Sequence, residues 1–173
     1  KLRTLNSELP LAEVLPCGCP STHIQTFSSP CGEGSESLRN GKGVSYLTHW
    51  PVQIRLLPPT APFLKGAHLL VVADCAPVAY PDFHRDFLEG KVVMMGCPKF
   101  DDAEEYIERF AEIFKRAHIK HVTILTMEVP CCSKLPLIIR QAMTIAGKDI
   151  SGEIIIISAN GRILKNLSLS IKD

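Results

Sequence analysis

Four short apolar runs divide the chain from residue 69 onward, and each is bounded by turn residues. They are Leu69–Ala73, Val92–Met95, Val122–Met127 and Ile154–Ile157. Runs of this length, rich in β-branched residues, are typical of strands buried on both faces of a sheet. An alternation of side chains from Val52 to Leu57, ended by Pro58 and Pro59, predicts one more strand at the start of the folded domain.

Helical spacing of apolar residues fills the intervals between these strands. The clearest pattern runs from Ala103 to Ala117, and we expect Asp101 to begin this helix, with Glu104 three residues on. A shorter helix is predicted from Pro81 to Leu88, ending at Gly90. Another is predicted from Leu135 to Ala146, ending at Gly147.

Strands that alternate with helices predict an α/β fold of three layers around a mainly parallel sheet, Rossmann-like or flavodoxin-like. Asn160-Gly161 predicts a hairpin turn that leads into an antiparallel edge strand from about Ile163 to Leu167. Residues 1–48 are rich in Pro, Gly, Ser and polar residues, so we expect an irregular arm there. The folded domain is expected to cover residues 49–173.

Composition excludes several classes of function. The net charge is +1 and the pI about 7.8, without a cluster of basic residues, so nucleic acid is not expected as a partner. The apolar runs are too short to span a membrane. Seven cysteines, two of them adjacent, fit a reduced, cytoplasmic compartment better than a disulfide framework. Neither a dinucleotide fingerprint nor a P-loop follows any predicted strand.

Four cysteines follow the predicted strands directly. Cys75 comes after the first buried run, Cys97 after the second, and Cys131 with Cys132 after the third. The carboxyl ends of parallel strands lie at one edge of the sheet, which is where ligands bind in this architecture. Thiolates at that edge are expected to hold a metal centre, since they select zinc, copper(I) or iron–sulfur clusters. A helix that begins near Ser133 is expected to favour the ionised form of the adjacent pair.

Other residues add candidates of less definite role. Cys17 and Cys19 form a second pair in the arm, and Cys19 could join the site as an additional ligand, whereas Cys31 is expected to be a bystander. Any single cysteine could equally be a small buried apolar residue. Asp74 and Glu128 also end strands, where capping of helix amides is favoured over a hydrogen bond to another donor or an acid–base role.

The chain resembles the bacterial and archaeal proteins known as 4Fe–4S ferredoxins or iron–sulfur cluster-binding proteins, found largely in anaerobes. The resemblance covers most of the chain. It rests on Gly18-Cys19-Pro20-Ser21, Trp50-Pro51-Val52-Gln53, Pro59-Thr60-Ala61-Pro62-Phe63, Ala73-Asp74-Cys75, Gly96-Cys97-Pro98-Lys99 with Asp101-Asp102, and Met127-Glu128-Val129-Pro130-Cys131-Cys132. Members usually carry an N-terminal ferredoxin domain with clustered Cys-x-x-Cys motifs. This chain has none, so it resembles the domain that follows.

The resemblance implies that Cys19, Cys75, Cys97, Cys131 and Cys132 bind an iron–sulfur cluster of the 4Fe–4S type. The expected function is electron transfer in redox metabolism, with a redox protein or a ferredoxin domain as partner. Two alternatives stay open at this point. One is a thiol-redox or sulfur-handling enzyme that uses Cys131 and Cys132. The other is an interaction module with a zinc site. No acid–base pair in the sequence identifies an enzyme.

Overall fold

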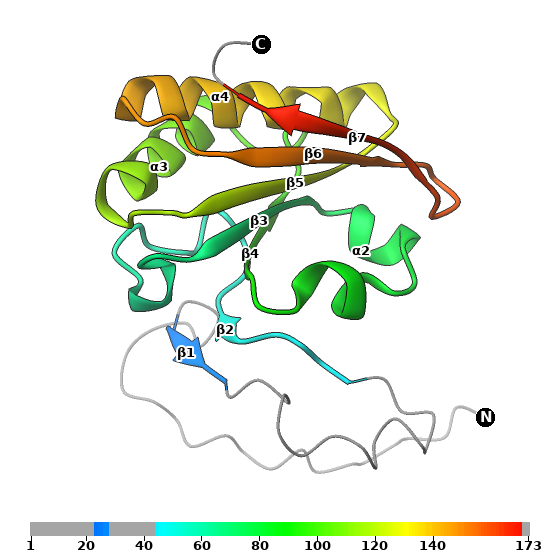
Figure 1. Cartoon of the computed structure of the whole chain (residues 1–173), viewed down its shortest axis with the longest axis horizontal. Helices are drawn as coiled ribbons and strands as arrows, with labels where there is room; N and C mark the ends of the chain where they lie inside the picture. Colours follow the sequence, from blue (N-terminus) through cyan, green and yellow to red (C-terminus); the bar gives the residue numbers. More distant parts are fainter. Residues whose placement is uncertain (1–22, 28–43, 171–173) are drawn as a thin grey trace, which may run out of the picture.

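The computed structural model describes residues 23–27 and 44–170, and the core of this part is a five-stranded sheet (Figure 1). The strand order is β4-β3-β5-β6-β7. The bounds are His68–Ala73 for β3, Val92–Gly96 for β4, His121–Met127 for β5, Gly152–Ile157 for β6 and Ile163–Leu169 for β7. The first four strands are parallel, and β7 pairs antiparallel with β6. The predicted fold class is thereby confirmed.

The connections between the parallel strands form the two outer layers. Helix α3 (Ala103–Arg116) joins β4 to β5 and packs against helix α4 (Lys134–Ala146), which joins β5 to β6. The connection from β3 to β4 crosses the sheet in the opposite direction. Right-handed crossovers therefore place α2 (Ala76–Ala79) and the π-helical turn η3 (His84–Leu88) on the other face.

Three details of the local structure differ from the sequence-based expectations. The strand predicted from Val52 to Leu57 is wrong, because the chain turns there so that Ile54 and Leu57 are both buried. Helix α3 begins one residue later than expected, because the Asp102 carboxylate accepts from the amides of Glu104 and Glu105. The helix predicted from Pro81 to Leu88 is reduced to η3, and the single turn of α2 precedes it.

The residues before the sheet lie along its β4 edge. Strand β1 (Gln25–Thr26) pairs antiparallel with β2 (His49–Trp50), and a cis peptide bond joins Trp50 to Pro51. Two further short helical turns complete the described chain, η2 (Pro62–Leu64) and η4 (Pro130–Ser133). Most of the predicted arm falls outside the described residues, so its boundary at residue 48 stays a prediction. Among the described helices, none has the length and apolar character needed to cross a bilayer.

Candidate functional site at the carboxyl edge of the sheet

The topology places four cysteines at the carboxyl edge of three adjacent strands. Cys75 follows β3, which is the middle one of these three strands. Cys97 follows β4 on one side of it, and Cys131 and Cys132 lie in η4, after β5 on the other side. The chain leaves β3 toward β4 on one side and leaves β5 toward β6 on the other, so the strand order reverses between β3 and β5. In open α/β sheets this reversal point is the usual place for ligand binding.

Three of these thiols lie close enough to influence one another. Cys132 is almost fully buried, with 3% of its surface exposed, while Cys131 is half-buried and Cys75 is exposed. The pKa of the Cys132 thiol is raised to about 11, mainly by burial and to a smaller extent by the charges of Cys131 and Cys75. We call Cys75, Cys131 and Cys132 the thiol group.

The start of α4 does not have the expected effect on Cys132. The sequence suggested that the helix beginning near Ser133 favours the thiolate form. Instead, burial outweighs the helix end for Cys132, so its thiol keeps its proton at neutral pH. The local chain explains the burial, because the Cys132 amide donates to the Val129 carbonyl and the 3₁₀ turn η4 directs the residue into the core. A ligand that displaces the proton must therefore bind thiolate strongly.

Cys97 lies beside a second group of side chains on the β4 side of the edge. The Tyr106 hydroxyl donates to the Asp101 carboxylate, and the charges of Asp101, Asp74 and Cys97 all act on the Tyr106 phenol. Burial is the largest cause of the raised pKa of Tyr106, and also of the raised pKa of Asp74. We call Asp74, Asp101 and Tyr106 the carboxylate–phenol group.

The sequence did not reveal that the Tyr106 hydroxyl lies at this edge, because its position in the helical pattern is that of an apolar residue on the inner face of α3. One signal was available. Gly96, at the end of β4, has space for no side chain, because an added Cβ would lie 1.9 Å from the Tyr106 hydroxyl oxygen. A glycine in a strand often marks such a close approach.

Neither of the two carboxylates expected to cap helix amides does so. Glu128 accepts from the Ala159 amide at 2.9 Å, in the turn after β6 rather than in a helix. Cys75, the residue before α2, makes no side-chain cap, and Asp74 instead hydrogen-bonds to the Gln53 side chain. Its Oδ1 atom is buried and has no hydrogen-bond partner among the described residues, so the capping prediction for Asp74 is wrong.

The donor chemistry at this edge suits a soft metal, but the thiols do not converge on a single point. In the described part of the chain, no three His, Cys, Asp or Glu side chains are grouped as ligands of one metal ion. The remaining predicted ligand, Cys19, and also Cys17 and Cys31, lie outside the described residues.

Comparisons with known proteins agree with the observed fold. The family model described as a Rossmann-like domain matches residues 61–172. An uncharacterized protein of Archaeoglobus fulgidus is 39% identical over 114 residues, which cover 66% of this chain and 80% of that protein. No solved structure matches.

Proposed function

Since the chain belongs to the Rossmann-like domain family, whose open sheets bind ligands at the carboxyl edge, we propose that it is an iron–sulfur protein of redox metabolism. Cys75, Cys97, Cys131 and Cys132 would hold a cluster of the 4Fe–4S type, and Cys19 would be an additional or alternate ligand. The observation that carries the proposal is the thiol group. Its members come from two different strand ends and lie together at the reversal point of the sheet.

We favour a cluster over a single ion because the ligands of a cluster need not meet at one centre. One zinc ion requires its ligands to point at one centre, at about 2.3 Å from each sulfur. The described residues offer no such arrangement of three ligands. A cubane cluster instead takes one thiolate at each iron atom, so its ligands stand around a larger body. Cys97, beside Cys75 on the neighbouring strand, is then a suitable fourth ligand.

The surrounding residues would determine how the site works. When bound, the cluster supplies one-electron transfer. Burial of Cys132 limits the access of water on the β5 side, which affects the reduction potential of such a site. Cys75 is exposed and faces solvent on the β3 side, where a partner could approach. We expect that partner to be a redox protein or a ferredoxin domain, as the resemblance implies.

Two observations weigh against the thiol-redox alternative. A thiol that attacks in such exchange needs a lowered pKa, and burial raises the pKa of Cys132 to about 11, which removes Cys132 as the attacking thiol beside Cys131. Cys131 and Cys132 are also consecutive residues of the 3₁₀ turn η4, where a disulfide between neighbours would distort the backbone. A metal competes with the thiol proton directly, so it does not require a low pKa in the free protein.

Metal analysis of anaerobically purified protein tests the proposal. We expect iron and acid-labile sulfide in about equal amounts, four of each per chain, with visible absorption that bleaches on reduction. Cys97→Ser and Cys132→Ser should each lower the iron content by more than half. Cys31→Ser, at the cysteine expected to be a bystander, is the matched control and should keep the full iron content.

Two results would overturn the proposal. Stoichiometric zinc in a colourless protein would assign the thiols to a zinc site. A metal-free protein that cannot be reconstituted with iron and sulfide, and that loses a countable number of thiols on mild oxidation, would assign them to thiol chemistry.

A further inference from the structure

Two histidines lie side by side at the amino edge of the sheet, the edge opposite to the cysteines. His68 begins β3 and His121 begins β5, and the two are register partners in the parallel pairing of these strands. Register partners on parallel strands point to the same face of the sheet. Their imidazole rings are accordingly neighbours, with 6.2 Å between the ring centroids and an angle of 35° between the ring planes.

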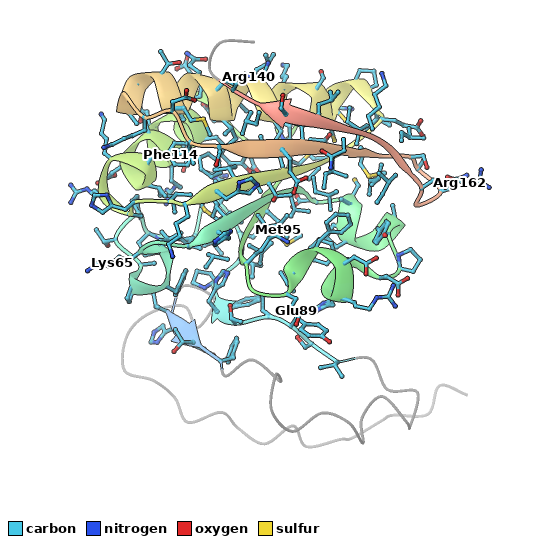
Figure 2. All side chains as sticks on the ribbon, viewed as in Figure 1. Lys65, Glu89, Met95, Phe114, Arg140 and Arg162 are labelled. Atoms are coloured by element: carbon cyan, nitrogen blue, oxygen red, sulfur yellow. The ribbon has the colours of Figure 1, made fainter. Side chains whose placement is uncertain are left out.

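This pair of histidines is separate from the site at the carboxyl edge. Strand β3 has six residues, so His68 lies roughly 17 Å from Ala73 along the strand, at about 3.3 Å per residue. Lys65, just before β3, and Arg162, in the turn after β6, lie at opposite sides of the molecule (Figure 2). The two imidazoles therefore cannot share a ligand with the thiol group.

The distance between the rings suits one metal ion held between them. A metal ion lies about 2.0–2.1 Å from an imidazole nitrogen, which is itself about 1.1 Å from the ring centre, so one ion can join ring centres up to about 6.4 Å apart. The observed 6.2 Å is within this reach. His68 is exposed and His121 is half-buried, so neither ring has to leave a packed core to turn a nitrogen toward the ion.

The surroundings hold the His121 ring in place. Its Nδ1 atom and the Ser151 hydroxyl oxygen are at hydrogen-bond distance, 3.4 Å apart. Histidines that bind a metal commonly use one ring nitrogen for such an outer hydrogen bond, which leaves the other nitrogen for the metal. Both histidines also belong to inner strands of the sheet, and ligands on strands are positioned more precisely than ligands on loops.

We propose that His68 and His121 together bind one divalent transition-metal ion of the copper, nickel or zinc class. Imidazole nitrogen suits these ions, whereas magnesium, calcium and manganese favour oxygen ligands. Within residues 23–27 and 44–170, no third His, Cys, Asp or Glu completes the ligand set. Two protein ligands leave the other coordination positions of the ion to water or to a donor of another molecule. The site goes beyond the proposed redox function and does not rest on it.

A titration with nickel(II) chloride, followed by NMR, tests the proposal. Octahedral nickel(II) is paramagnetic, so a bound ion broadens the resonances of the groups around it. We expect saturable broadening of the ring resonances of His68 and His121, and of the amide resonances at the starts of β3 and β5. The resonances at the carboxyl ends of these strands then serve as an internal reference for nickel bound by the thiols.

Substitutions sharpen the same titration, and the amide spectrum of each variant shows that it is folded. His68→Ala and His121→Ala should each weaken nickel binding at least about tenfold, since each removes one of two protein ligands. Ser151→Ala should weaken it by up to about tenfold, because the ring loses its outer hydrogen bond. His23→Ala, the matched control before β1, should leave the affinity unchanged. Cys97→Ser should leave it unchanged as well.

Three results would overturn the proposal. The first is no broadening at the starts of β3 and β5 at millimolar nickel. The second is an unchanged affinity in both His68→Ala and His121→Ala. The third is broadening confined to the segments that carry cysteines, which would assign the nickel to the thiols alone. The iron content of the protein plays no part in these outcomes, so the metal site and the redox proposal can fail independently.

Discussion

The two edges of the sheet differ in whether another part of the chain covers them. At the β4 edge, the segment from His49 to Leu57 lies against the strand and takes up its free backbone groups. Met95 donates its amide to the Val52 carbonyl, Ile54 donates to the Met95 carbonyl, and Val93 donates to His49 Nε2, all at 2.9–3.0 Å. At the β7 edge, no described residue does the same.

The difference shows that the two edge strands of one sheet can be protected in different ways. The β4 edge is closed with buried side chains, since His49, Ile54 and Leu57 are fully buried. Closing an edge in this way prevents pairing with other chains. At the β7 edge no described segment covers the strand, and Lys165 lies on it instead. A lysine on an edge strand also disfavours pairing with other chains, so the two edges are protected by different means.

The largest effect is expected from filling the space at the end of β4. Gly96→Ala should lower the free energy of unfolding by about 3 kcal/mol or more, because the new Cβ overlaps Tyr106, a fully buried residue. Urea denaturation measures the loss. Adding Tyr106→Phe should recover part of it, since the hydroxyl oxygen is the closest atom. A Gly96→Ala protein as stable as the parent would show that the closed edge tolerates looser packing.

Acidification should weaken the closed edge selectively. Burial lowers the pKa of His49 from 6.5 to about 4, and the Pro51 backbone offsets this only in part. Below pH 6.5 the unfolded chain therefore binds a proton that the folded chain excludes, and stability falls as the pH drops to about 4. The loss from this residue is up to about 3 kcal/mol, at about 1.4 kcal/mol for each pKa unit.

Unfolding free energies measured from pH 7 to pH 4 check this expectation against His49→Leu. The leucine variant should be less stable at pH 7, because the Val93 amide loses its acceptor, but its stability should fall less steeply with acid. Parallel pH profiles for the two proteins would contradict the assignment to His49.

The smallest effect is expected at the open edge. Ile163→Thr should change the free energy of unfolding by less than about 0.5 kcal/mol, because about half of the side chain is already in solvent. The same substitution at the closed edge, Ile54→Thr, should cost about 2 kcal/mol or more, since that side chain is fully buried. Equal losses in thermal or urea unfolding would remove the contrast between the edges.

The strands and the main helices follow closely from the sequence pattern, for local reasons. The four apolar runs are β-branched and bounded by turns, and each is a strand. Gly147 ends α4 in the left-handed conformation, as a C-terminal glycine does. The strand prediction for Val52 to Leu57 was wrong because alternation alone does not distinguish a strand from a turn. In this turn the buried apolar residues, Ile54 and Leu57, are three positions apart.

The candidate site was predictable only in outline. Residues that follow parallel strands must share one edge, so the approach of Cys75 to Cys131 and Cys132 could be expected from the order of elements. The grouping of Cys97 with Tyr106 and Asp101 could not, because it depends on how α3 packs over β4. The raised pKa of Cys132 likewise depends on its burial, which no sequence motif encodes.

The sequence by itself determined the α/β order, the parallel sheet and the edge at which the cysteines gather, because periodicity and crossover handedness are properties of the chain. The tertiary structure alone decided which edge of the sheet is closed, which thiols are buried and which polar side chains hydrogen-bond to each other. These depend on contacts between residues far apart in the chain, where burial and close approach determine the energies.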